Sequence, residues 1–403
     1  MESKKFQTTY DDITVTTNAT SSWPLRHGDP KPPAGCRVVA LGDFLPWDNP
    51  DNLVSKEAEK AVDTAVAVVF LPILFLVSTP VNVINIMVFW RQGLKERINL
   101  CLFSLSLTDL LYMIHSFLLN VDRLYLESTR DPSKLGLTFK FIVNHKLVGF
   151  RGLSWVSGFL SMLIACERCF CVVSPLRSKT ILQTGTTAAL IILSSLIILT
   201  GFFFVCTRWS IACIFNPLTG VTSDTIYGSE FYIQNRQVLD ILDGIVYGLV
   251  LPALYVIVVL VTTVLTSLRL RQMANWREKT SSASVSPREV ALTRMLIGIS
   301  VLYVVCTMPT LTLGLCILFV PDISLNGRYY NTFNLMVSVF ELFSYINASV
   351  NFFVYCFLGS KYKETLTEMF RCGIIMKFIG ERDKRTNAET SEDVTEISAM
   401  PNL

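Results

Sequence analysis

The sequence predicts an all-α membrane protein, with seven transmembrane helices in a bundle and a short amphipathic eighth helix after them. Of its 403 residues, 51% are hydrophobic and 17% are charged, a balance that is not typical of a soluble domain. The apolar residues also gather in seven stretches of about 20 or more residues, each long enough to cross roughly 30 Å of hydrocarbon as a helix. An odd number of crossings places the two termini on opposite sides of the membrane.

The seven predicted spans divide the chain into three parts. In chain order they cover residues 62–90, 98–120, 142–172, 184–207, 236–270, 288–320 and 331–358. We therefore expect an N-terminal tail of residues 1–61, a membrane domain of residues 62–371 that includes the eighth helix, and a C-terminal tail of residues 372–403. The first forty residues show no apolar core of a signal peptide, so the first span is expected to carry the tail across the membrane.

The loop charges predict the orientation, because lysine and arginine in short loops stay cytoplasmic. Basic residues follow the first, third, fifth and seventh spans: Arg91, Lys95, Arg97, Arg177, Lys179, Arg269, Arg271, Arg277, Lys279, Arg288, Lys361, Lys363 and Arg371. The loop after the second span is also basic, but nearby acids partly balance it. We expect a multi-pass protein of the plasma membrane with its N-terminus outside and its C-terminus in the cytoplasm.

Charged residues lie within the second and third spans. Asp109 is in the middle of the second span, where acids usually mark ion or proton pathways. Arg168, beside Glu167, lies at the predicted cytoplasmic end of the third span and needs a partner at that depth. Ser157 precedes Arg168 by about three helical turns, so we expect both residues on one face of the helix.

The sixth and seventh spans carry a proline and a pair of amides. Pro309 removes one backbone hydrogen bond from the sixth span and is expected to form a hinge. Glu289 lies at the cytoplasmic end of the same span, roughly 30 Å from Pro309 at 1.5 Å per residue. Asn347 and Asn351 are one turn apart in the seventh span and are expected to share a face.

These motifs resemble those of rhodopsin-like (class A) G-protein-coupled receptors over residues 62–371. The string 166–169, Cys-Glu-Arg-Cys, is similar to the family's Asp/Glu-Arg-Tyr signature, 306–309 to its Cys-Trp-x-Pro hinge, and 351–355 to its Asn-Pro-x-x-Tyr motif. Pro252 matches the family's proline in the fifth span. Thr307, Phe352 and Leu260 depart from the family pattern, which has tryptophan, proline and commonly tyrosine there. The general look also resembles invertebrate neuropeptide and chemosensory receptors.

The resemblance implies coupling to a heterotrimeric G protein at the cytoplasmic end. Arg168 would pair with Glu167 and Glu289 at rest, and an outward swing of helix six about Pro309 would release it. Tyr355 would keep a switch role.

The resemblance also implies a sodium ion as allosteric modulator. Asp109, Ser157, Asn347 and Asn351 match the positions that line the family's sodium pocket. The alternative is a polar seam that joins the helices through hydrogen bonds worth about 1 kcal/mol each.

The ligand class follows mainly by exclusion. Phe150 stands where amine receptors have an aspartate, and Tyr345 where opsins have a lysine. Four charged residues are expected in the outer halves of the helices: Arg151, Asp240, Asp243 and Glu341. Buried charges need partners, so these residues either pair with one another or bind a ligand with charged or strongly polar groups. They favour a short (neuro)peptide ligand, and a small polar chemosensory ligand is the alternative.

Three covalent modifications are expected outside the spans. The family's usual cysteine at the outer end of the third helix is missing near Val143, so we expect Cys36 in the tail to pair with Cys213 in the second outer loop. Asn18 begins an Asn-Ala-Thr glycosylation acceptor. Cys372 is a candidate for palmitoylation, with a free thiol as the alternative. Phosphorylation of the C-terminal tail would favour arrestin binding, although a plain solvated tail is equally compatible.

Other functional classes fit the sequence less well. A transporter would more often show internal repeats, which this chain lacks. A decoy receptor that binds ligand without coupling fits the altered motifs. An enzyme is not expected, because the sequence has no phosphate loop, no His-Glu-x-x-His and no nucleophile elbow. No nucleic-acid partner is expected.

Overall fold

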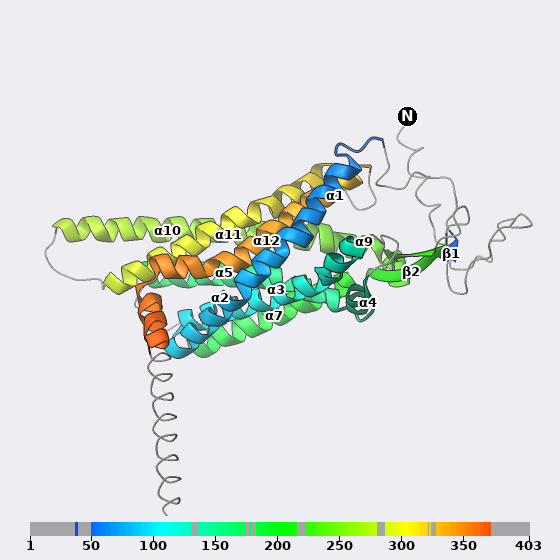
Figure 1. Cartoon of the computed structure of the whole chain (residues 1–403). Coiled ribbons are helices and arrows are strands. Elements are labelled where there is room, and N and C mark those ends of the chain that lie inside the picture. The colour runs from blue at the N-terminus through cyan, green and yellow to red at the C-terminus, as the bar shows by residue number, and fades with distance from the viewer. Residues whose placement is uncertain are drawn as a thin grey trace, which may run out of the picture. The chain divides into compact units, whose positions relative to one another are not determined.

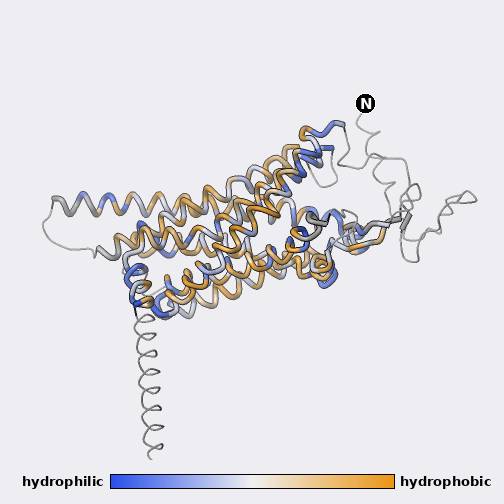
Figure 2. Tube along the Cα trace, viewed as in Figure 1, coloured by the Kyte–Doolittle hydropathy of each residue, from blue (hydrophilic) through white to orange (hydrophobic). Residues whose placement is uncertain are grey.

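The computed structural model describes residues 37–38, 50–129, 136–174, 178, 183–215, 222–279, 287–320, 322–323 and 328–371. The chain forms two compact units, residues 1–42 with 212–226 and residues 43–211 with 227–403. In the larger unit, long helices pack side by side (Figure 1). Their hydrophobic residues run along the bundle, and hydrophilic residues collect towards its ends (Figure 2).

Within the described residues, seven helices are long and apolar enough to cross a membrane, which confirms the predicted fold class. The first crossing comprises α1 (Lys56–Thr64), the π-helix η3 (Ala65–Phe70) and α2 (Leu71–Gln92), and the second is α3 (Arg97–Thr129). The third comprises the 3₁₀-helix η4 (Leu147–Gly152) and α5 (Leu153–Val173), and the fourth is α7 (Thr184–Cys206).

The remaining crossings come after a loop that contains the short helix α8 (Glu230–Gln234). The fifth comprises α9 (Arg236–Asp240), the π-helix η5 (Ile241–Val250) and α10 (Leu251–Lys279). The sixth is α11 (Pro287–Phe319) and the seventh is α12 (Tyr330–Leu358). A further helix covers residues 360–371, where the eighth helix is predicted, and it turns away from α12 (Figure 1).

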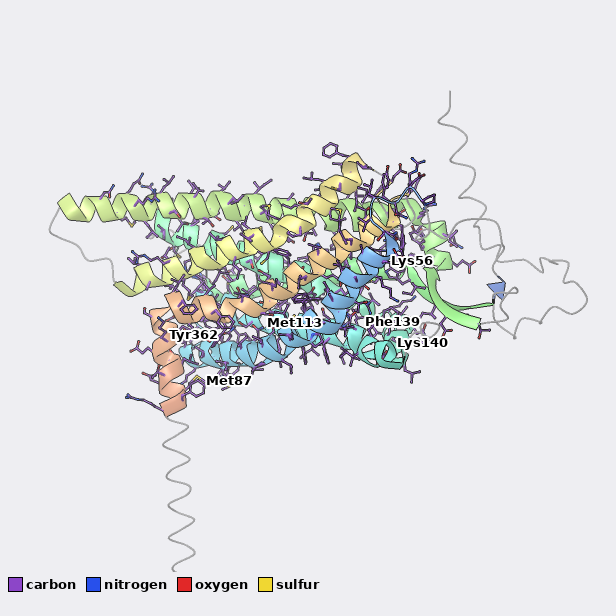
Figure 3. The ribbon with its side chains drawn as sticks, turned by 45° about the horizontal axis from the view of Figure 1, so that its top comes forward. Lys56, Met87, Met113, Phe139, Lys140 and Tyr362 are labelled. Carbon is purple, nitrogen blue, oxygen red and sulfur yellow. The ribbon has the colours of Figure 1, made fainter. Side chains whose placement is uncertain are left out.

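The bundle has an apolar interior and an apolar exterior. Met113 of α3 is fully buried among the helices, whereas Met87 of α2 is 48% exposed on the surface of the bundle (Figure 3). On α7, Ile192 and Ile197 are exposed by 60% and 64%. Apolar side chains on the outside of long helices are suited to contact with lipid tails, so the exposed surface itself supports a membrane location.

The third crossing begins later than the sequence predicted. Residues 137–144 form a separate helix, α4 (Leu137–Asn144), and Lys146 then adopts a left-handed conformation with φ of 57°. The predicted start at residue 142 is therefore wrong. Hydropathy alone runs on through this point, but the left-handed residue ends the helix, and the Lys146 ammonium donates to the carbonyl of Trp209 at 2.5 Å.

Three other helices extend beyond their predicted ends, among them the fifth crossing, which continues to Lys279 rather than ending at 270. The first begins at Lys56, where the Ser55 hydroxyl accepts a hydrogen bond from the backbone N–H of Ala58 at 3.2 Å and caps the helix. The second continues to Thr129 rather than ending at 120. Hydropathy marks only the part of a helix that crosses hydrocarbon, so polar turns that stay helical outside it are missed.

Strands are present in the loop between α7 and α8, which the all-α prediction did not include. They are β2 (Trp209–Phe215) and β3 (Thr222–Gly228), and the sheet has the order β1-β2-β3. β1 (Arg37–Val38) pairs with β2 in parallel, with Arg37 opposite Ile214. β2 is rich in β-branched and aromatic residues, namely Trp209, Ile211, Ile214 and Phe215, a composition that favours a strand.

The π-helix in the fifth crossing creates a close backbone contact with α11. Pro252 has no N–H to donate to the carbonyl of Gly248, four residues earlier. Gly314 packs against this carbonyl, and a Cβ on Gly314 would lie 2.6 Å from the Gly248 oxygen. Only glycine therefore allows α11 and η5 to approach this closely.

We expect Gly314→Ala to destabilise the bundle by about 1–3 kcal/mol, because a backbone carbonyl cannot move aside as a flexible side chain can. The melting temperature of the purified protein in detergent measures the effect. Gly244→Ala is the matched control, because a Cβ at Gly244 meets no atom within 4 Å. Equal losses in the two variants would contradict the close contact.

Candidate functional site

Asp109 is buried where α3 meets α5 and α12. The Ser157 hydroxyl of α5 donates to Oδ1 of Asp109 at 2.6 Å, and the Asn351 amide of α12 donates to Oδ2 at 3.0 Å. Asn347 of α12 lines the same cavity. The structure therefore brings together all four residues that the sequence grouped, and one carboxylate joins three helices.

A cavity of about 50 Å³ lies beside Asp109. Its walls come from α3, α5, α10, α11 and α12. Aromatic and hydroxyl side chains dominate them: Tyr112, Trp155, Tyr255, Tyr303 and Phe340, with Ser154, Ser157, Thr307, Thr310 and Ser344. A buried water needs about 10–15 Å³ of such space. The cavity can therefore hold one small chemical group but not a whole peptide.

The hinge residues lie against this cavity. Pro252 and Thr307 line it, and Pro309 follows Thr307 by two residues within α11. The Thr307 hydroxyl donates to the carbonyl of Tyr303 at 2.7 Å, so its short side chain bonds to its own helix. A proline inside α11 leaves one turn without a backbone bond, which makes this turn a suitable pivot.

Trp155 of α5 occupies the cavity wall as its largest side chain, and the sequence reasoning missed it. Its indole N–H donates to the carbonyl of Tyr247 in η5 at 2.7 Å. Its ring centroid lies 4.8 Å from that of Phe202 and 6.2 Å from that of Phe340. Trp155 thus contacts the fourth, fifth and seventh crossings. A buried indole needs a hydrogen-bond partner, and this requirement was the available signal in the sequence.

Arg151 and Glu341 form an ion pair between α12 and the helix η4 that leads into α5. The Tyr345 hydroxyl also donates to Glu341 at 3.2 Å. The side chains of Arg151 and Glu341 are 35% and 18% exposed, and Phe150 beside them is 40% exposed. Three predicted ligand-binding residues, Arg151, Glu341 and Tyr345, are thus joined, and Arg151 is the more accessible of the two charged groups. The ring of Phe150 packs on those of His115 and Phe203, with centroids 5.9 and 5.0 Å away.

Asp240 and Asp243 are paired within the protein, through a residue that the sequence reasoning did not single out. Arg208 is buried and forms an ion pair with Asp243, and its Nη2 lies 3.9 Å from Asp240. The guanidinium also lies over the rings of Trp209 and Tyr232, at 4.9 and 5.1 Å.

The Tyr232 hydroxyl completes this group by donating to Asp240 at 2.9 Å. Burial, and then the charge of Asp240, raise the pKa of Tyr232, which keeps the hydroxyl protonated as a donor. Of the two possibilities that the sequence left open for these acids, the geometry therefore favours a structural pairing.

Arg168 lies beside Glu167, as the sequence suggested, with 3.2 Å between its Nε and Oε2 of Glu167. The side chains are only 14% and 6% exposed. Glu167 also lies 3.6 Å from Arg97 of α3, whose Nη1 donates to the carbonyl of Ser178 at 2.6 Å. Arg97 entered the sequence reasoning only as a loop charge. The side chain of Glu289 is outside the described part of α11, so its contact with Arg168 stays a prediction.

Two cavities adjoin Arg168. The first, of about 10 Å³, is bounded by threonine, serine and apolar residues of α10 and α11: Thr263, Thr266, Thr293, Leu296, Ile297 and Ser300. The second is an open hollow of about 510 Å³ shared with Lys95, Arg97, Gln183 and Thr184. The first cavity leaves no room for another protein between Arg168 and the side of the bundle formed by α10 and α11, whereas the second hollow is open.

Tyr355 is fully buried near the same end, and its hydroxyl has no hydrogen-bond partner among the described residues. Its ring centroid lies 5.2 Å from that of Phe89 and 5.4 Å from that of Tyr362. Tyr362, labelled in Figure 3 after the end of α12, donates to Asn85 of α2 at 2.7 Å. The residue 360–371 helix is thus fastened to the first crossing. Nothing in the sequence had pointed to the pairing of Tyr362 with Asn85.

The predicted modifications fall largely outside the described residues. Cys213 is disulfide-bonded, but its predicted partner Cys36 lies outside the described residues, so the pairing stays a prediction. Asn18 and Cys372 also lie outside them.

Comparison with known proteins gives one family. The model of the family described as "Serpentine type 7TM GPCR chemoreceptor Srw" matches residues 67–373, about three quarters of the chain. The matched range includes the cavity, Arg168 and the helix after α12. No curated protein matches the chain.

We expect Arg208→Met to destabilise the protein by about 1–3 kcal/mol, because it leaves two carboxylates without their shared cation. Arg236→Met is the matched control: Arg236 also pairs with Asp240, at 3.5 Å, but is 57% exposed, and such surface pairs are worth at most about 1 kcal/mol. Melting temperatures in detergent compare the two. A larger loss for Arg236→Met would contradict the assignment of Arg208 as the central cation.

Proposed function

Because the chain belongs to the Srw family of serpentine seven-transmembrane chemoreceptors, we propose that it binds an extracellular ligand and activates heterotrimeric G proteins at the plasma membrane. The loop charges support an extracellular N-terminus and a cytoplasmic C-terminus. The end of the bundle with Arg168 then faces the cytoplasm, and the end with Arg151 and Glu341 faces outward.

The observation that carries the proposal is the closure of α10 and α11 over Arg168. The cavity of about 10 Å³ between them is too small for a partner, while Arg168 itself is largely buried. A displacement of α11 would widen this small cavity and join it, past Arg168, to the open hollow. This is the change needed to admit a helix of a G protein.

Pro309 supplies the pivot between ligand and G protein. It lies in α11 two residues from Thr307, which lines the cavity, and roughly 30 Å from Glu289 at 1.5 Å per residue. A ligand that contacts this turn shifts the balance between closed and open states by its difference in affinity for the two. The swing of helix six releases Arg168 from Glu167 and Glu289, and Tyr355, with no described partner for its hydroxyl, can change its contacts in the open state.

A short peptide is the ligand that we propose first. The partly exposed ion pair of Arg151 and Glu341 offers charged contacts to a peptide backbone or side chain, and the cavity of about 50 Å³ accepts one inserted group. A small polar molecule is the second candidate. The small volume of the cavity and the chemoreceptor description of the matching family favour it.

We also propose that Asp109, Ser157, Asn347 and Asn351 hold a sodium ion. All four side chains offer oxygen atoms, which suit a hard cation, and the ion would supply the positive charge that a buried carboxylate needs. The hydrogen bonds from Ser157 and Asn351 support this grouping and are equally those of a polar seam between helices.

We expect Glu289→Ala to raise basal G-protein activation, because it removes one partner that holds Arg168 in the closed state. The combined variant Glu289→Ala with Arg168→Ala should return activation to background. A bioluminescence assay of G-protein dissociation, run across G-protein subtypes at matched surface levels, measures both.

Glu368→Ala is the control, because it removes an exposed acid at the same end of the bundle. The lock would be refuted if Glu289→Ala matched the wild type and Glu368→Ala in every subtype. If Arg168→Ala, alone or combined with Glu289→Ala, left G-protein activation unchanged in every subtype, the receptor would not couple to G proteins.

A further inference from the structure

We propose that the cavity beside Asp109 is a subsite for an organic cation, an ammonium or guanidinium group carried by the ligand. This group and sodium would compete for the Asp109 carboxylate. The inference rests on the proposed function for one point only, that a ligand enters from the end of the bundle with Arg151 and Glu341. Beyond the proposed function, the proposal specifies the chemical class of the ligand group that enters the cavity beside Asp109.

The charge of the cavity selects a cation. Among the described residues that line it, Asp109 alone carries a formal charge. Its two hydrogen-bond donors, Ser157 and Asn351, are neutral. A carboxylate buried with neutral donors only is short of a counter-charge. A positively charged group in the cavity would supply it.

The walls favour an organic cation over a metal ion alone. Five aromatic side chains line a cavity of about 50 Å³: Tyr112, Trp155, Tyr255, Tyr303 and Phe340. Aromatic faces attract ammonium and guanidinium groups, tryptophan most strongly. Sodium needs oxygen ligands, and the carboxylate, hydroxyl and amide groups would satisfy it without any ring. The aromatic side chains therefore suit a second occupant.

The small side chain of Thr307 leaves the cavity undivided. The lining runs without a break from Asp109 and Ser157 to Thr310 and Phe340. The hydroxyl of Thr307 bonds to its own helix, so the side chain does not close off the space around Asp109. A large side chain at this position would fill it.

The far wall of the cavity is next to the proposed entry. Ser154 lines the cavity, and its hydroxyl donates to the carbonyl of Arg151 at 3.1 Å, one helical turn away. Phe340 lines it and directly precedes Glu341. A ligand that displaces the Arg151–Glu341 pair is therefore only about one helical turn away from the cavity. Phe150, where amine receptors have their aspartate, lies outside this lining, so the subsite differs from the amine site.

The test uses the purified full chain in lipid nanodiscs, with melting temperature measured against cation concentration at constant ionic strength. N-methyl-D-glucamine is the reference cation, because it is too bulky for a cavity of about 50 Å³. We expect sodium, methylammonium and methylguanidinium each to raise the melting temperature with saturation. Sodium should shift the methylguanidinium curve to higher concentration, and Asp109→Asn should abolish all three effects.

Two variants separate the organic cation from sodium. Phe340→Leu should weaken the binding of methylguanidinium by roughly 2- to 30-fold, the range expected for the loss of one cation–π contact. The affinity for sodium should change little. Thr307→Trp should remove the methylguanidinium effect by filling the cavity. Thr307→Val, which matches threonine in size, is its control and should keep the effect.

The outcomes are distinct. If sodium stabilises the protein and neither organic cation does, Asp109 serves a metal ion only and the proposal is overturned. Stabilisation by methylguanidinium that survives Asp109→Asn or Thr307→Trp would overturn it as well. If the organic cations bind as expected but no Glu289 or Arg168 variant alters signalling, the subsite stands and coupling to G proteins fails.

Discussion

A carboxylate in the middle of a transmembrane helix must find its partners inside the protein, because hydrocarbon offers none. Asp109 meets this constraint through Ser157 of α5 and Asn351 of α12. These two bonds fix three helices around one point and leave a cavity beside it. The walls of that cavity include Pro252 and Thr307, so the carboxylate and the proposed pivot of α11 adjoin the same space.

Through α12, the contacts of Asp109 continue to the end of the bundle that contains Arg168. Asn351 binds Asp109, and one turn later Tyr355 packs between Phe89 and Tyr362. Tyr362 in turn holds the helix of residues 360–371 to α2. Because α12 also packs against α11, a change at Asp109 can reach the end where α11 covers Arg168. Side-chain contacts at Asp109 and at Arg168 therefore lie along one connected set of helices.

Much of the bundle and the Asp109 group could be predicted from sequence, because both follow from the hydropathy and periodicity of single helices. Asp109, Ser157, Asn347 and Asn351 lie where helical spacing places them. Features that depend on distant pairs were missed: Arg208 finds Asp243 35 residues away, and Arg97 finds Glu167 across two helices. The left-handed turn at Lys146 and the strands β2 and β3 were also missed, because a hydropathy window does not detect a local backbone change.

The distance between the ends of α2 and α11 near Arg168 would show whether the contacts of Asp109 keep α11 over Arg168. Spin labels at Arg91 and Arg294, both exposed, can be introduced as non-natural amino acids because the chain has 11 cysteines. Pulsed electron resonance in nanodiscs would compare the wild type with Asp109→Ala, which removes both acceptors at the centre of the bundle. If these contacts keep α11 in place, Asp109→Ala has a larger population at long distance than the wild type. Superimposable distance distributions would contradict this role of the contacts.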